Sequence, residues 1–346
     1  MPKRVWASSW ASVVWTCRSR GIHRKVGQPI GPSLGESAMT DINYQVRMER
    51  RDERRLVALY RGGIAWRLLA TFAAFTVAWI AILVAGFVGA IPLWLGGILS
   101  FAVATTFYMP MHEATHGNVW GDTMKGRWVE DLVGMLSAIP TGFSYKGHRV
   151  SHMRHHAFTN DPEKDPDFIA QGPLRKLPVK FYGAVMVQTL LPLFAFVPAT
   201  QVLLPRVIRE NQAERVLQDE RYTFRYWLVS TTVLIVAFIA GVGVEAIVLW
   251  FIPTKLVLCW LTLIFAWYPH HPAEGKIGRY VDTRVAVFPG SRLVIRGHDY
   301  HALHHLFPRV VHYRLPKLWR EIGPQMTAKG IRTEGRALGA TQPITW

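Results

Sequence analysis

Long apolar segments constrain the fold of this chain more than any other feature of its sequence. Residues 64–90 are almost entirely apolar and are long enough to cross the ~30 Å hydrocarbon core of a bilayer as a helix. After a short break, residues 93–109 form a second apolar run, so the two together predict a transmembrane hairpin. Residues 226–268 predict a second hairpin that turns near residues 241–245.

The composition agrees with a membrane protein. Half of the residues are hydrophobic and only 18% are charged, whereas soluble domains usually carry about 25% charged residues. The formal net charge is +17, but the basic residues flank the apolar runs, which favours the cytoplasmic side of a membrane over a nucleic-acid partner. The Arg-rich segment 39–63 predicts a surface helix before the first span, and it places the outer ends of both hairpins on the cytoplasmic side.

Two further segments are apolar but contain polar residues or prolines that argue against a transmembrane helix. Residues 128–145 contain acidic residues and Pro140, which predicts a helix in the membrane interface. Residues 181–204 contain two prolines and Gln188, and we expect them to lie in the interface or to re-enter the membrane. Within the second hairpin, Lys255 is the exception, because a lone charge inside a span is costly unless it reaches the interface.

This pattern predicts three parts: a basic tail and surface helix at 1–63, a membrane domain at 64–320 and a C-terminal tail at 321–346. Residues 1–38 fit a transit segment, a disordered tail, or sequence upstream of a start at Met39.

Histidines are concentrated in three stretches that follow the apolar runs. Spacings of three and four residues place side chains on one face of a helix, so each stretch can direct several imidazoles to one point. Their number exceeds the needs of one tetrahedral zinc ion and suits two ions; it fits iron that reacts with dioxygen, although ligand type alone does not exclude copper. The stretches contain His112 and His116; His148, His152, His155 and His156; and His298, His301, His304 and His305.

These motifs, HxxxH, HxxHH and HxxHH separated by membrane hairpins, resemble those of the membrane-bound di-iron fatty acid desaturase and carotenoid hydroxylase superfamily. The resemblance covers about residues 90–320 and includes the segments from His155 to Asp167 and from His304 to Pro308. It implies an all-α integral membrane protein with four transmembrane helices in two hairpins, interfacial helices and a cytoplasmic histidine-rich cap that holds two iron ions.

The resemblance also implies which residues form the site. Possible further ligands are His148 and His298, and one of the adjacent pair His270 and His271. Asp167 and Asp299 would accept the free N–H groups of ligating imidazoles. The expected iron ligands are His112, His116, His152, His155, His156, His301, His304 and His305.

The implied activity is O2-dependent desaturation of the fatty-acyl chains of lipids, in a bacterial inner membrane. The two cysteines form no CxxC pair, and a fused cytochrome b5 signature is absent from the sequence, so a separate ferredoxin, rubredoxin or cytochrome with its reductase must supply electrons. Residues 165–173 look as much like the carotenoid ring hydroxylase and ketolase branch, which is the alternative. A histidine-rich metal-binding or transport protein is a remote alternative, since transport predicts polar residues along the spans.

Overall fold

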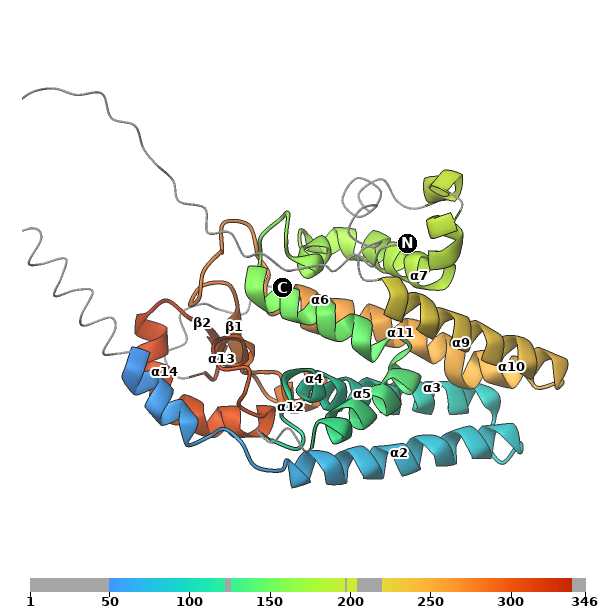
Figure 1. Cartoon of the computed structure of the whole chain (residues 1–346), viewed down its shortest axis with the longest axis horizontal. Helices are drawn as coiled ribbons and strands as arrows, with labels where there is room; N and C mark the ends of the chain where they lie inside the picture. The colour runs from blue at the N-terminus through green and yellow to red at the C-terminus, as the bar shows by residue number, and fades with distance from the viewer. Residues whose placement is uncertain (1–49, 122–125, 197, 204–219, 338–346) are drawn as a thin grey trace, which may run out of the picture. The chain divides into compact units, whose positions relative to one another are not determined.

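The structure is a computed structural model that describes residues 50–121, 126–196, 198–203 and 220–337 (Figure 1). The predictions for residues 1–38 fall outside the described residues. The described residues from Asp52 onward form one compact unit. The helices are α2 (Trp66–Phe87), α3 (Leu93–Ala104), α4 (Tyr108–His116), α5 (Arg127–Thr141), α6 (Tyr145–Phe158), α7 (Leu177–Phe196), α9 (Glu220–Ile239), α10 (Gly243–Ala246), α11 (Ile252–Leu261), α12 (Ser291–Val294), α13 (His301–Leu306) and α14 (Leu315–Ala328).

Shorter elements connect these helices. Two π-helical turns precede and follow α11, and two short strands pair in parallel near the C-terminal end of the described chain. They are the 3-10 turns η1 (Thr105–Phe107), η3 (Pro166–Ala170), η4 (Leu174–Lys176), η5 (Pro198–Leu203) and η8 (His312–Arg314), the π-helices η6 (Ile247–Phe251) and η7 (Thr262–Trp267), and the strands β1 (Arg284–Val287) and β2 (Arg332–Gly335).

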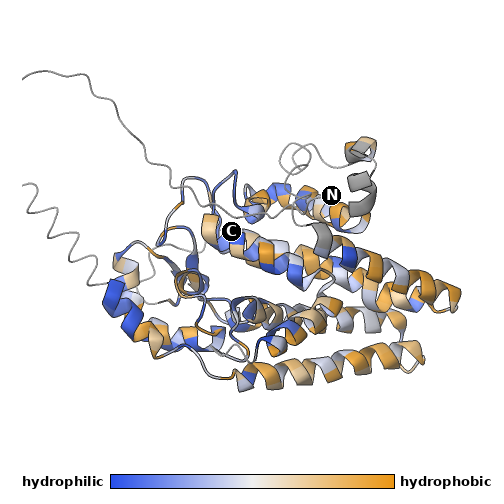
Figure 2. Cartoon of the chain, in the orientation of Figure 1, coloured by the Kyte–Doolittle hydropathy of each residue, from blue (hydrophilic) through white to orange (hydrophobic). Residues whose placement is uncertain are grey.

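Four helical segments of the described chain are long and apolar enough to cross a membrane. They are Trp66–Phe87, Leu93–His116, Tyr222–Ile239 and Gly243–Trp267, which confirms the two predicted hairpins. The expected position of helix α7 in the interface, or re-entering the membrane, stays a prediction. Figure 1 shows both hairpins running in the same direction away from α13, and Figure 2 shows hydrophobic residues concentrated on α2, α9 and α10.

The two hairpins pack closely because small residues face a large one. A Cβ atom on Gly86 or Gly96 would lie under 3.0 Å from the side chain of Leu249, so only glycine leaves room for this leucine. Small residues allow such close approach of helices in membranes. Within the first hairpin, the indole N–H of Trp79 donates to the hydroxyl of Ser100 over 3.0 Å.

Helix α5 has one buried and one exposed apolar face, in agreement with the interfacial helix that we expected. Val129 and Val133 are buried in the core that surrounds α4. On the other side, large apolar side chains are exposed, which suits a helix lying in the plane of the membrane surface. These exposed residues are Trp128, Leu132, Met135, Leu136 and Ile139.

The C-terminal region contributes to the core. The expected boundary between 320 and 321 falls within α14, whose Trp319, Ile322 and Met326 are buried. Strand β2 then pairs with β1 in parallel, with Arg284 opposite Arg332. The three-part division of the chain stays a prediction.

Of the expected surface helix, residues 52–58 are helical, and Lys329 donates to the carboxylate of Glu53 on that helix.

Candidate metal centre

Three helices and one loop bring the histidines together. Helix α4 carries the first stretch and ends at Gly117, whose φ of 69° is the left-handed conformation that glycine adopts readily at helix ends. Helix α6 begins at Ser144, whose hydroxyl accepts the N–H of Gly147, and carries the second stretch. Helix α13 carries His301, His304 and His305 of the third stretch, and His270 follows η7 at the end of the fourth candidate span.

Within the described residues, nine histidines form two groups that could each hold a metal ion. In each group the candidate ligand nitrogens all lie within 4.8 Å of one another. The two groups adjoin, because the rings of His156 and His305 stack with centroids 4.2 Å apart. The first group is His112, His116, His152, His156 and His304, and the second is His155, His270, His301 and His305.

Contacts in the first group fit a shared cation better than hydrogen bonds between rings. The Nε2 atom of His152 lies 3.0 Å from those of His116 and His156, and the Nε2 atom of His156 also lies 3.0 Å from that of His304. A neutral imidazole has one N–H, so these three consecutive contacts cannot all be ordinary hydrogen bonds. A positive ion among the four nitrogens would use the lone pair of each.

The separations themselves suit a six-coordinate ion. Two nitrogens bound at ~2.1 Å lie about 3.0 Å apart when their bonds meet at 90°, and about 3.4 Å apart in a tetrahedron. In the second group, the Nε2 atoms of His270 and His301 are 2.9 Å apart. These contacts are closer to the separation expected for bonds that meet at 90° than to the tetrahedral one.

Burial keeps most of these imidazoles neutral, as metal ligands must be. It lowers the pKa of His152, His156 and His304 in the first group, and of the second-group histidines other than His155, well below 6.5. Both ring nitrogens of His112 and the Nε2 of His305 are buried without a hydrogen-bond partner. Such groups are costly to bury unless something binds them.

The hydrogen bond that we expected from Asp167 is made by Asp165 instead. The carboxylate of Asp165 accepts from His155 Nδ1 over 2.8 Å, whereas the nearest oxygen of Asp167 is 3.7 Å from that nitrogen. Burial lowers the pKa of His155, but the carboxylates of Asp167 and Asp165 outweigh it and raise that pKa to about 8. Asp165 thus fixes the ring so that Nε2 faces the second group.

Asn160 connects the turn after α6 with the loop that follows His270. Its backbone N–H donates to Asp165, and its side-chain amide donates to the carbonyls of Lys276 and Asp282 over 2.8 and 2.7 Å. With a φ of 63°, Asn160 adopts the left-handed conformation that asparagine tolerates better than most residues. We did not single out Asn160 from the sequence.

Of the four histidines suggested as possible further ligands, only His270 belongs to one of the two groups. His298 is buried and His148 is half-buried, and each has an unpartnered ring nitrogen, yet neither belongs to a group. His270 joins the second group, whereas the ring of His271 stacks on Trp267 at 4.4 Å. In the described structure, Asp299 accepts from Ser291 and from no imidazole, so a role beside a ligand stays a prediction.

Glu113 lies between the predicted ligands His112 and His116 in the sequence, but its carboxylate hydrogen-bonds to neither of them in the described structure. It is completely buried, and it accepts from the amide of Asn118 over 2.6 Å and from the backbone N–H and Nδ1 of His312. Asn118 also donates to the carbonyl of Pro308. These bonds hold the end of α4 against the segment that follows α13.

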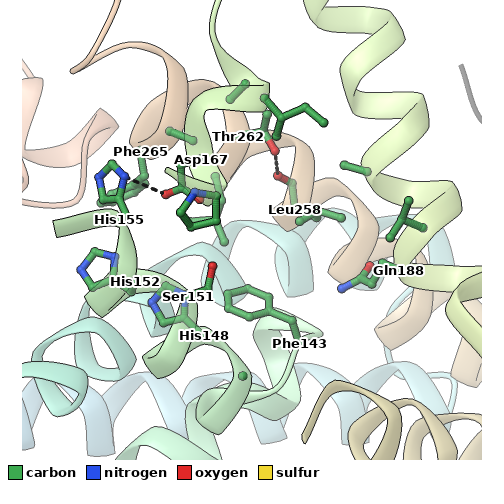
Figure 3. A pocket seen from close by; sticks show the side chains of 18 of the residues that line it. Phe143, His148, Ser151, His152, His155, Asp167, Gln188, Leu258, Thr262 and Phe265 are labelled. Carbon is green, nitrogen blue, oxygen red and sulfur yellow. Dashed lines mark hydrogen bonds and ion pairs between the residues drawn. The ribbon is translucent and has the colours of Figure 1, made fainter. Parts of the chain in front are cut away.

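A cavity of about 420 Å³ reaches both groups (Figure 3). His152 of the first group and His155 and His301 of the second line it. Much of the wall is apolar and comes from α7, α11 and η7. It includes Ile169, Ala170, Ala184, Val187, Leu258, Leu261, Phe265 and Ala266. This arrangement can hold an apolar chain beside the histidines.

Comparison with known proteins agrees with this arrangement. The family model described as fatty acid desaturase matches residues 91–335, and the chain belongs to that family. A relative from Nostoc sp. (strain 36), the sn-1 acyl-lipid omega-3 desaturase (ferredoxin), is 22% identical over 67% of this chain and 69% of its own length. A relative from Sorghum bicolor named "Probable fatty acid desaturase DES1" is 23% identical over 63% of this chain and 60% of its own length, less than two thirds.

The family and the four apolar helices together define a membrane protein of the oxidoreductase class.

Proposed function

We propose that this protein desaturates fatty-acyl chains of lipids, using two iron ions, O2 and electrons from a separate donor. The observation that carries the proposal is the pair of buried histidine groups facing one cavity with a largely apolar wall. The names of both relatives support an acyl substrate over a carotenoid ring. When bound, the irons would activate O2 for removal of hydrogen from an unactivated C–H bond.

The protein would contribute positioning and exclusion of water. An acyl chain lying against Leu258 and Phe265 places one of its carbons beside His152 and His155, which line the same cavity. A small misplacement of that carbon would slow hydrogen removal or change the position of the new double bond. The imidazoles themselves are the proposed ligands and have no separate acid–base role.

Electron supply and membrane side are parts of the same proposal. The name of the Nostoc relative includes ferredoxin, which supports a separate small protein as electron donor. Rubredoxin or a cytochrome with its reductase would serve equally. His116 ends the second candidate span and His270 follows the fourth, so two of the candidate spans in the described part of the chain separate them. An even number puts both on one side, and we place that side in the cytoplasm of a bacterial cell.

Expression in a host that contains saturated acyl lipids, β-carotene and a ferredoxin system tests the proposal. Lipid mass spectrometry should show acyl chains lighter by two hydrogens, whereas oxygen added to carotenoid rings would support the hydroxylase alternative. The purified protein should bind about two irons per chain. His155→Ala should abolish product while leaving membrane insertion intact. A protein that retains only zinc after reconstitution would contradict the di-iron centre.

A further inference from the structure

Lys255 places a positive charge halfway along the fourth candidate span, Gly243–Trp267. Charged residues inside membrane spans are costly and usually pair with another group or mark a functional path. The ammonium of Lys255 donates to Oε1 of Gln188 over 2.8 Å, and it lies 4.6 Å from the ring centroid of Phe251. The charge is therefore directed toward α7.

Gln188 brings this charge into contact with the cavity, because its own side chain lines the wall. Its amide also donates to the carbonyl of Gly142. A glutamine amide can donate twice and accept twice, so these two bonds use half of its capacity. A bound molecule in the cavity can therefore form a hydrogen bond with Gln188.

This polar pair lies across the cavity from the candidate metal centre. Figure 3 shows Gln188 on the opposite side of the view from His152 and His155, with Phe265 beside His155 and Leu258 between the two sides. The wall from Leu258 to Ala266 extends about 12 Å at 1.5 Å per helical residue. A chain that lies along this wall has one end at Gln188 and an interior carbon beside the histidines.

We propose that Gln188 and Lys255 form a subsite for a hydroxyl or carboxylate group at the end of a long-chain lipid. This inference rests on the proposed function, since the chain is the one that the histidine groups would act on. A methyl end would displace water from Gln188 and Lys255 without replacing the hydrogen bonds of that water. Sites that hydrogen-bond a polar substrate group strongly reject analogues that lack the group. The subsite thus sets which carbon reaches the metal centre.

Two sources could provide this end group. The carboxylate of a free fatty acid could enter first, or a lipid held at its other end could carry a hydroxyl on its tail. Three probes of equal chain length separate them: methyl hexadecanoate as the reference, hexadecanoic acid, and methyl 16-hydroxyhexadecanoate. Binding is measured on the purified full chain in detergent by displacement of a fluorescent fatty ester, without turnover.

The wild-type protein should bind either hexadecanoic acid, for its carboxylate, or methyl 16-hydroxyhexadecanoate, for its hydroxyl, roughly tenfold more tightly than methyl hexadecanoate. Preference for the acid identifies the free carboxylate, and preference for the hydroxy ester identifies the tail hydroxyl. Lys255→Met should remove the preference. Lys317→Met, the same change at an exposed position on α14, should retain it. If Lys255→Met fails to fold, Gln188→Met keeps the lysine and should lose the preference alone.

Equal binding of all three probes by the wild-type protein would overturn the subsite, as would a preference that survives both Lys255→Met and Gln188→Met. A purely structural role would lower the melting temperature of these variants without changing the ratio of affinities. Failure of the proposed function is distinguishable, because it appears as absent desaturation product while the binding preference persists.

Discussion

Replacing Asp165 by Asn tests the most specific support of the candidate metal centre. Its buried carboxylate accepts three N–H donors: His155 Nδ1 and the backbone of Asn160, both at 2.8 Å, and the backbone of Asp167 at 2.9 Å. An asparagine amide has one oxygen, so its NH2 group must face at least one of these donors in either orientation. The substitution changes few atoms but removes at least one buried hydrogen bond.

The expected loss follows from these contacts. A hydrogen bond to a charged group contributes about 1.5–3 kcal/mol, so we expect the free energy of unfolding to fall by about 2 kcal/mol. Removing the carboxylate behind a ligating imidazole usually lowers metal affinity about 10- to 100-fold. Because Asp165 contacts only His155 among the predicted ligands, the iron of the second group should be lost first.

Iron per chain after dialysis against increasing chelator, measured together with desaturation product, checks this expectation. Asp161→Asn is the matched control, since its carboxylate accepts the backbone N–H groups of Glu163 and Lys164 in an exposed turn that asparagine also supports. The control should keep iron and activity. Equal iron retention by Asp165→Asn and wild type, or equal loss by both variants, would refute the assigned role.

Three further predictions concern stability. Asn160→Ala should lower the free energy of unfolding by about 3 kcal/mol, because it loses two buried hydrogen bonds and strains a left-handed residue; Asn160→Gly should recover the strain component in the same denaturant titration. Burial raises the pKa of Glu130 from 4.5 to about 7. The protonated carboxyl group therefore contributes stability to the fold that is fully present below pH 4.5 and is lost as the pH rises through 7. Glu130→Gln should flatten the dependence of the melting temperature on pH over this range. Gly96→Ala should lower the melting temperature through its clash with Leu249, and Leu249→Ala in the same chain should restore part of it.

The hairpins and the histidine stretches could be predicted because they depend on local patterns. Span length is set by bilayer thickness, and spacings of three and four residues place side chains on one helix face whatever the tertiary structure. Parity then required α7 to stay out of the count of spans, which stays a prediction. The partner of Lys255 could not be predicted, because Gln188 lies 67 residues earlier and meets it only through packing of α7 on α11.

Acidic residues near the histidines show the same limit at shorter range. Asp165 and Asp167 lie two residues apart in a Pro-rich turn, and either could have reached His155. We expected Asp167 to contact the imidazole, yet Asp165 accepts from both His155 Nδ1 and the backbone N–H of Asp167. A carboxylate has acceptor capacity for several donors, so forming a turn does not prevent it from orienting a ligand.

The choice between His270 and His271 illustrates why helical periodicity fails at this site. The fourth candidate span contains the π-helical turns η6 and η7, and η7 ends three residues before His270. Each π-helical turn takes up extra residues, so it rotates everything after it relative to a regular α-helix, and such turns occur often at functional sites. Counting at 3.6 residues per turn from the apolar face of α11 therefore cannot say which imidazole faces the second group. The same η7 provides Phe265 and Ala266 to the cavity wall. One irregular turn thus positions both a predicted iron ligand and the surface against which the substrate chain would lie.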